Sequence, residues 1–173
     1  MYIKRTSIKN FHNFKDFETS FEPFTVITGA NNSGKTNLFA AMGKVMSLSS
    51  PRNARVLQTD FNDAAKRIVI EIVFDSLTDL DIAAFYHPTG LINPKANTVT
   101  IRFESVWNTE EQDVVSESYF VRDDLDGEKQ RSVDYTRKYR EYIAHYFTSA
   151  FNAVEGQLSF SHKQSFGKVI RAF

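Results

Sequence analysis

The sequence predicts an α/β fold in which a mixed sheet carries an antiparallel β-lobe, and three observations support that class. A glycine-rich loop at residues 29–36 stands between an apolar, β-branched run and a segment with helical spacing of apolar residues. Residues 67–75 form a strongly apolar strand pattern, and residues 97–107 and 113–121 predict a hairpin around a polar turn. A strand, a loop and a helix in succession, followed by paired strands, are typical of an α/β domain.

The N-terminal residues predict a hairpin that precedes the loop. Residues 2–10 alternate as a strand should, and residues 15–21 predict a second strand after a turn at His12 and Asn13. Residues 24–28 read Phe-Thr-Val-Ile-Thr and predict a buried strand that leads into the glycine loop. The first helix is expected to run to about Leu48, because the proline that follows at position 51 stops a helix.

The glycine loop has the pattern of a phosphate-binding loop. Residues 29–36 read Gly-Ala-Asn-Asn-Ser-Gly-Lys-Thr and fit G-x-x-x-x-G-K-[ST]. Gly29 and Gly34 allow backbone angles and close approaches that a Cβ would block. Lys35 is expected to reach the β- and γ-phosphates of a nucleotide, and the Thr36 hydroxyl to ligate Mg²⁺. Phosphate oxygens would also accept hydrogen bonds from the inward-pointing backbone N–H groups at the start of the helix, which belong to Asn31, Asn32, Ser33, Gly34, Lys35 and Thr36.

The residues between these motifs predict surface loops and helices. Residues 51–66 are expected to form a polar loop, residues 77–86 a short helix, and residues 122–131 a charged loop. The longest helix is expected over residues 132–151. The chain stops within an apolar, helix-compatible pattern that has no cap, which is typical of a truncation.

The longest predicted helix carries an aromatic face made of Tyr135, Tyr139, Tyr142 and Tyr146. We expect this face to pack on the sheet. Two alternatives stay open, namely an exposed stripe that stacks on nucleic-acid bases and a contact between two copies of the chain.

Composition excludes several classes of protein. The 21 Lys and Arg residues balance 21 Asp and Glu residues, whereas a protein that coats duplex DNA is usually more basic. Because the chain has no cysteine, it has no disulfide framework, thiolate zinc site or cysteine nucleophile. The N-terminus has no signal-type apolar core and no apolar run approaches membrane-spanning length, so we expect a soluble, cytoplasmic domain with no membrane partner.

The N-terminal hairpin and the loop together resemble one group of ATPases. Residues 3–14 read Ile-Lys-Arg-Thr-Ser-Ile-Lys-Asn-Phe-His-Asn-Phe and resemble the opening hairpin of the RecF, SMC and OLD (overcoming lysogenization defect) ATPases, commonly written I-x-N-F-[RK]-x-F. The loop sequence G-A-N-N-S-G-K-T-N-L is similar to the OLD and RecF version, in which Asn commonly follows the Ser or Thr. This similarity adds Asn37 to the expected nucleotide-binding residues.

The resemblance implies the N-terminal half of an ABC-type P-loop ATPase head, closest to OLD-like ATP-dependent endonucleases. In this family two heads sandwich two ATP molecules, and their ATP-driven engagement acts on DNA in repair, chromosome maintenance or anti-phage defence. The implied ligands are therefore ATP and Mg²⁺, and the implied partners are DNA, a second head in a homodimer, or the C-terminal half of the same head. Residues 1–50 would hold the hairpin, loop and first helix, residues 51–131 the β-lobe, and residues 132–173 a helical segment leading to an insert or the C-terminal half.

The resemblance also implies roles for residues outside the loop. Asn10, Phe11 and His12 would lie near the adenine and phosphates. The family usually has Arg or Lys where this chain has His12, which reaches less far and is only partly charged at neutral pH. The family's glutamine loop, which contacts Mg²⁺ or water, follows the first helix, so Gln58 is the implied residue and Asp60 is the second candidate.

Two parts of a complete head are not recognisable in the sequence. A working site needs a Ser- and Gly-rich signature motif and a strand ending in Asp-Glu that holds Mg²⁺ and activates water. There is no Ser-Gly-Gly, and Asp75 is followed by Ser76 rather than Glu. We therefore expect this chain alone to bind ATP with little or no turnover, hydrolysis requiring the C-terminal half and head dimerisation. A non-catalytic, nucleotide-gated interaction module and a P-loop kinase are the alternative functions.

Overall fold

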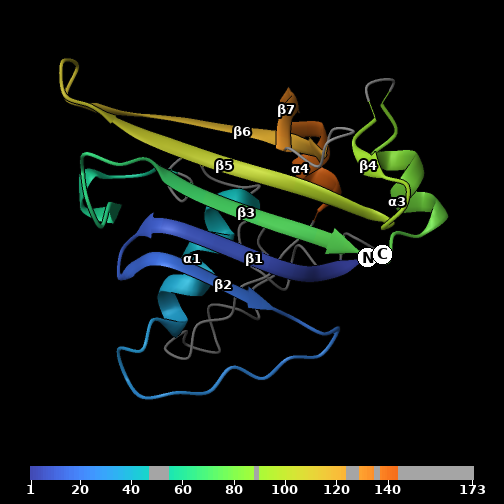
Figure 1. Ribbon diagram of the computed structural model, residues 1–173, viewed down its shortest axis with the longest axis horizontal. Helices are drawn as coiled ribbons and strands as arrows, with labels where there is room; N and C mark the ends of the chain where they lie inside the picture. Colours follow the sequence, from blue (N-terminus) through green and yellow to red (C-terminus); the bar gives the residue numbers. More distant parts are fainter. Residues whose placement is uncertain (47–54, 88–89, 124–128, 135–136, 144–173) are drawn as a thin grey trace, which may run out of the picture. The chain divides into compact units, whose positions relative to one another are not determined.

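The computed structural model describes residues 1–46, 55–87, 90–123, 129–134 and 137–143. Within them lies one seven-stranded sheet with the strand order β2-β1-β3-β5-β6-β7 and β4 beside β5 (Figure 1). Every strand pairing between these residues is antiparallel. The predicted antiparallel pairing of the lobe strands is confirmed, and the N-terminal hairpin belongs to the same sheet; the mixed sheet stays a prediction. The strands are β1 (Tyr2–Phe11), β2 (Phe14–Ser20), β3 (Ile68–Asp75), β4 (Ile92–Asn93), β5 (Thr98–Asn108), β6 (Asp113–Asp123) and β7 (Lys129–Asp134).

Four short helical segments accompany the sheet within the described residues. They are α1 (Lys35–Met46), the 3-10 helix η1 (Gln58–Asp60), α3 (Asp79–Ala84) and α4 (Arg137–Tyr142). None of the helices in the described ranges is both long and apolar enough to cross a membrane.

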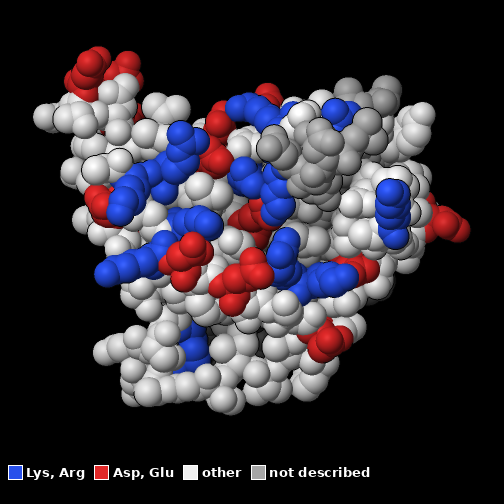
Figure 2. All heavy atoms as spheres, in the orientation of Figure 1, with Lys and Arg blue, Asp and Glu red and all other residues white. Residues whose placement is uncertain are grey.

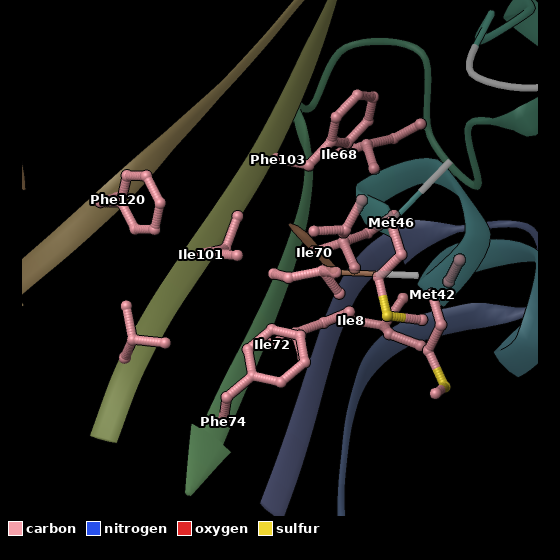
Figure 3. Close-up of a cluster of buried hydrophobic side chains, with 14 of the residues drawn as sticks. Ile8, Met42, Met46, Ile68, Ile70, Ile72, Phe74, Ile101, Phe103 and Phe120 are labelled. Carbon is pink, nitrogen blue, oxygen red and sulfur yellow. The ribbon is translucent and has the colours of Figure 1, made fainter. Parts of the chain in front are cut away.

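Alternation along the central strands divides the sheet into an apolar face and a charged face. On β3, Ile68, Ile70 and Ile72 are fully buried on one face, while Glu71 between them points to the other. Helix α1 covers the apolar face, and Figure 3 shows its Met42 and Met46 beside the isoleucines of β1 and β3. This burial fixes α1 against the sheet, because apolar area removed from water is the main stabilising contribution in a small domain. The residues of α1 that face the sheet are Leu38, Ala41, Met42, Val45 and Met46.

The opposite face carries side chains of both charges that neutralise one another. Figure 2 shows Lys and Arg interspersed with Asp and Glu over the strands. Glu71, only 5% exposed, accepts a hydrogen bond from Arg102 at 2.8 Å and another from Lys129. Burial raises the pKa of Glu71, but the bonds from Lys129 and Arg102 outweigh it, so the pKa lies below its ordinary value. Nearby, Glu104 accepts from the Tyr119 hydroxyl at 2.9 Å.

Asp81 connects the start of β1 with α3 and α4. Its carboxylate accepts hydrogen bonds from the Met1 amine at 3.1 Å, from the backbone N–H of Thr78 at 2.8 Å and from the Tyr142 hydroxyl at 2.7 Å. Burial raises the pKa of Asp81, but the bonds from Thr78 and Tyr142 outweigh it and bring the pKa down to about 2. The ionised carboxylate therefore holds three parts of the chain together.

The aromatic face predicted for residues 132–151 packs on the sheet where the structure describes it. Tyr139 is 8% exposed, and its ring centroid lies 4.9 Å from that of Phe120 on β6. Tyr142 is 40% exposed and bonds to Asp81. Tyr135 and Tyr146 lie outside the described residues. Packing on the sheet is therefore confirmed for Tyr139.

Two predicted elements differ from the structure near that helix. The expected charged loop at residues 122–131 is in part strand, since β6 continues to Asp123 and β7 begins at Lys129. Helix α4 begins at Arg137 instead of position 132. Strand β7 has Val133 as its one apolar residue, so it lacks the apolar alternation that predicts a strand; its Arg131 bonds to Glu117 of β6 instead.

The buried strand predicted at residues 24–28 is wrong for the described structure. This segment forms no strand, and Phe24 is 86% and Val26 69% exposed. Its β-branched composition suits a strand, but a strand also needs a neighbour that satisfies its backbone N–H and C=O groups. No strand among the described residues pairs with it.

The buried hydroxyl of Thr6 predicts a stabilising substitution. Thr6 is fully buried on the apolar face, and its Oγ1 has no hydrogen-bond partner. Thr6→Val keeps the shape and removes the desolvated hydroxyl, so we expect the free energy of unfolding to rise by about 1 kcal/mol in a denaturant titration. Thr6→Ser, which keeps the hydroxyl and removes the methyl group, should lower it. A valine variant less stable than the parent would contradict this reading of the core.

The depressed pKa of Asp81 predicts a pH-dependent stability. A carboxyl whose folded pKa lies below its unfolded value stabilises the fold fully above about pH 4, and the contribution is lost as the pH falls towards 2. We expect Asp81→Asn to cost about 1–2 kcal/mol at neutral pH and progressively less as the pH approaches 2, measured by denaturant titration of both proteins at several pH values. A difference that does not shrink on acidification would contradict the assignment.

Candidate nucleotide-binding site

The glycine loop follows the unpaired segment 24–28 and leads directly into α1, which begins at Lys35. Gly34 has a φ of +100°, a conformation that residues with a side chain rarely adopt. A Cβ on Gly34 would lie 2.8 Å from Nδ2 of Asn13 and 3.0 Å from Cζ of Phe14. Two features therefore require glycine at position 34, namely its backbone angle and the close approach of the β1–β2 turn.

The Lys35 ammonium lies within the loop. Its Nζ donates hydrogen bonds to the carbonyl oxygens of Gly29 at 2.8 Å and Ala30 at 2.7 Å, with Ser33 Oγ at 3.3 Å. The backbone N–H of Ser33 also donates to the Ala30 carbonyl, at 3.2 Å. These contacts hold both ends of the loop around one positive charge.

The start of α1 offers further groups that favour an anion. The first N–H groups of a helix have no partner within the helix, and its N-terminus carries a partial positive charge. No acidic residue occurs in the first turn of α1, and Lys35 is the one charged residue within positions 29–37. Thr36 is exposed at this end and Asn37 is half-buried. The loop and helix together fit a phosphate group with an associated cation, because they present donors, one ammonium and a free hydroxyl.

Asn10 and Phe11, two residues implied to lie near the nucleotide, have structural partners. The Asn10 side chain, 5% exposed, donates to the carbonyl oxygens of Asp63 at 2.9 Å and Lys66 at 2.7 Å, and accepts from the N–H of Asp63 at 2.7 Å. Phe11 is fully buried in the core. These contacts fix the segment 61–66 against β1, and a contact of either residue with a nucleotide stays a prediction.

His12 lies in the turn beside the loop, and its ring faces η1. Its Nε2 is 3.5 Å from Oδ1 of Asp60, and its ring packs edge-on against Phe11 with centroids 4.3 Å apart. The side chain is one-third exposed, so it remains accessible from solvent. A phosphate contact by His12 stays a prediction.

The two candidates for the glutamine loop sit in η1 and differ in exposure. Gln58 is exposed, whereas Asp60 is 9% exposed and accepts hydrogen bonds from Lys44 Nζ at 3.2 Å and from the backbone N–H of Leu57 at 3.1 Å. The Asp60 carboxylate therefore serves a structural role, and the Mg²⁺ role of Gln58 stays a prediction. Within the ranges that the structure describes, no group of three or more His, Asp or Glu side chains could hold a metal ion.

Sequence reasoning missed the residues that support the loop from the β1–β2 turn. Asn13 Oδ1 accepts a hydrogen bond from Asn37 Nδ2 at 2.7 Å, and Phe14 lies against Gly34. Both residues stand inside the hairpin motif. The motif itself contained no signal for the contact, because it joins residues 24 positions apart.

Comparison with known proteins shows that the chain is similar to one ATPase family and to several proteins of known name. A family model described as "AAA ATPase domain" matches residues 1–167. The chain is 36% identical over 85 residues to chromosome segregation protein sudA of Emericella nidulans, covering 44% of this chain and 7% of that protein. It is 41% identical over 56 residues to the DNA replication and repair protein RecF of Halalkalibacterium halodurans, covering 32% of this chain and 15% of that protein.

A third relative extends the similarity further along the chain. The structural maintenance of chromosomes protein 3 of Saccharomyces cerevisiae is 33% identical over 111 residues, which is 59% of this chain and 9% of that protein. These matches confirm the resemblance to RecF and SMC proteins. The aligned parts amount to between 7% and 15% of the relatives' own length.

The close packing at Gly34 predicts a strong effect of the smallest possible substitution. Gly34→Ala should lower the free energy of unfolding by about 1–3 kcal/mol, because its Cβ meets Asn13 and Phe14 in an unfavourable backbone conformation. Gly43→Ala is the matched control: that glycine lies within α1 with nothing within 4 Å of an added Cβ, so stability should rise by about 0.5–1 kcal/mol. Equal effects of the two variants in a denaturant titration would contradict the assigned loop conformation.

Proposed function

This chain belongs to the AAA ATPase domain family, and on that premise we propose that it binds ATP and Mg²⁺ through the loop at residues 29–36. The observation that carries the proposal is the Lys35 ammonium, held by loop carbonyls at the N-terminal end of α1. A phosphate group there would meet that ammonium and the backbone donors around it, with no carboxylate among positions 29–37 to repel it.

Each residue of the loop has a distinct role in this proposal. Lys35 binds the β- and γ-phosphates, and the N–H groups of residues 31–36 donate to phosphate oxygens, that of Ser33 exchanging its bond to the Ala30 carbonyl for one to phosphate. The exposed Thr36 hydroxyl ligates Mg²⁺, with Gln58 as a further contact to the ion or its water. The metal ion, when bound, neutralises charge on the phosphates. His12, whose ring is one-third exposed, is the proposed contact outside the loop.

We further propose that the chain serves an ATPase that acts on DNA in repair, chromosome maintenance or anti-phage defence. The names of its relatives, which concern chromosome segregation and DNA replication and repair, support this role. An OLD-like ATP-dependent endonuclease is the finer assignment that we propose; the Asn that follows the loop threonine agrees with it, as it does with a RecF-like protein.

Hydrolysis, in this proposal, requires a further segment that completes the head and a second head in a dimer. The unpaired segment 24–28 supports this requirement, because its exposed Phe24 and Val26 and its free backbone groups suit pairing with an additional strand. The same exposed segment also favours a second candidate function, a nucleotide-gated interaction module in which ATP regulates docking of a partner.

Calorimetric titration of ATP–Mg²⁺ into the chain and its Lys35→Ala variant tests the proposal. We expect measurable binding by the parent chain and at least a tenfold loss of affinity in the variant, because a charge-assisted contact to phosphate is removed. Lys44→Ala is the control, since that lysine lies at the other end of α1 and bonds to Arg55 and Asp60. Equal affinity of the parent and the Lys35→Ala variant would contradict the assignment of the loop.

A phosphate-release assay tests the proposal that hydrolysis requires a further segment and a second head. We expect ATP binding by this chain with little or no turnover. Sustained turnover by the purified chain, abolished by Lys35→Ala, would show instead that the chain hydrolyses ATP without a completing segment or a second head.

A further inference from the structure

The turn between β1 and β2 contacts the beginning of α1 through one side chain. Asn13 Oδ1 accepts the hydrogen bond from Asn37 Nδ2 at 2.7 Å. Nδ2 of the same amide lies close to Gly34, since a Cβ added to Gly34 would be 2.8 Å from it. The amide group of Asn13 thus faces both the last glycine of the loop and the first turn of the helix. These are the two places whose backbone N–H groups would face a bound phosphate.

The turn that carries Asn13 is itself fixed on its other side. The backbone N–H of His12 donates to the Asp60 carbonyl at 2.7 Å, and Asn62 Nδ2 donates to the His12 carbonyl at 2.6 Å. The strands on both sides of the turn are paired up to Phe11 and Phe14. Asn13 therefore projects from a well-supported part of the sheet.

Contacts inside the loop do not provide this support. The bonds of Lys35 to Gly29, Ala30 and Ser33 connect the loop with itself, and the segment that precedes the loop is unpaired. A second polar contact between α1 and its surroundings lies near the opposite end of the helix, where Lys44 bonds to Arg55 and Asp60. The Asn13–Asn37 hydrogen bond connects the phosphate-binding end of α1 to the β1–β2 turn.

We propose that Asn13 is a positioning residue for nucleotide binding, which holds Asn37 and the start of α1 so that the loop N–H groups converge on the phosphates. This inference rests on the proposed function of the loop. Asn13 does not touch the nucleotide in this account. It acts through Asn37 and Gly34, and the pair with Asn37 is formed before the nucleotide binds.

The test is titration of ATP–Mg²⁺ into Asn13→Ala, together with thermal melting with and without ATP–Mg²⁺. We expect the affinity to fall about three- to tenfold, the loss that one hydrogen bond produces. The melting temperature without ligand should change little, because the pair is exposed, whereas the rise caused by ligand should shrink. A purely structural role would give the opposite pattern, a lower melting temperature without ligand and an unchanged affinity.

Asn108→Ala is the matched control, because this asparagine also bonds in an exposed turn, to the N–H groups of Glu110 and Glu111 between β5 and β6. Its affinity for ATP–Mg²⁺ should equal that of the parent chain. A cycle with Asn37→Ala adds a second criterion: once Asn37 is removed, Asn13→Ala should weaken binding no further.

The outcomes separate this inference from the function on which it rests. Lys35-dependent binding by the parent with full affinity in Asn13→Ala would overturn the positioning role alone. Additive losses in the double variant would also overturn it, since Asn13 would then not act through Asn37. Absence of Lys35-dependent binding in the parent chain would overturn the proposed function and this inference together.

Discussion

The approach of the β1–β2 turn to Gly34 is the constraint on which the candidate site depends. Asn13 and Phe14 lie where a side chain at position 34 would stand, so glycine is the residue that fits there. The positive φ of Gly34 favours glycine as well. The chain then enters α1 at Lys35, which places the ammonium within reach of the Gly29 and Ala30 carbonyls. One steric contact thus sets the path of the loop, the start of the helix and the position of its charge.

The two faces of the sheet differ, and its apolar face supports the contact between the β1–β2 turn and Gly34. Its apolar face anchors α1 through burial, so the helix beginning is held at a fixed place beside the turn. Its other face pairs carboxylates such as Glu71 with several cations, which leaves charges of both signs interspersed instead of one strong field. The one concentrated positive feature within positions 29–37 is the Lys35 ammonium.

Local patterns in the sequence predicted the features that depend on neighbours along the chain. The hairpin, α1, β3 and the β5–β6 pair follow from periodicity, and the loop follows from a contiguous motif. The unpaired segment 24–28 could not be predicted in this way, because a strand forms only where another strand meets it. The burial of Asn10 and Phe11 and the support from Asn13 depend on residues more than 20 positions away, which no local pattern records.

The most direct test of the account follows the backbone amide resonances of the chain by nuclear magnetic resonance while ATP–Mg²⁺ is added. The account predicts that the largest shift changes fall on residues 31–37 and on the adjoining turn at residues 12–14, with small changes on the charged face of the sheet. Large changes centred on β5 to β7 with an unaffected loop would contradict the central claim that the Gly34 contact builds a phosphate-binding site.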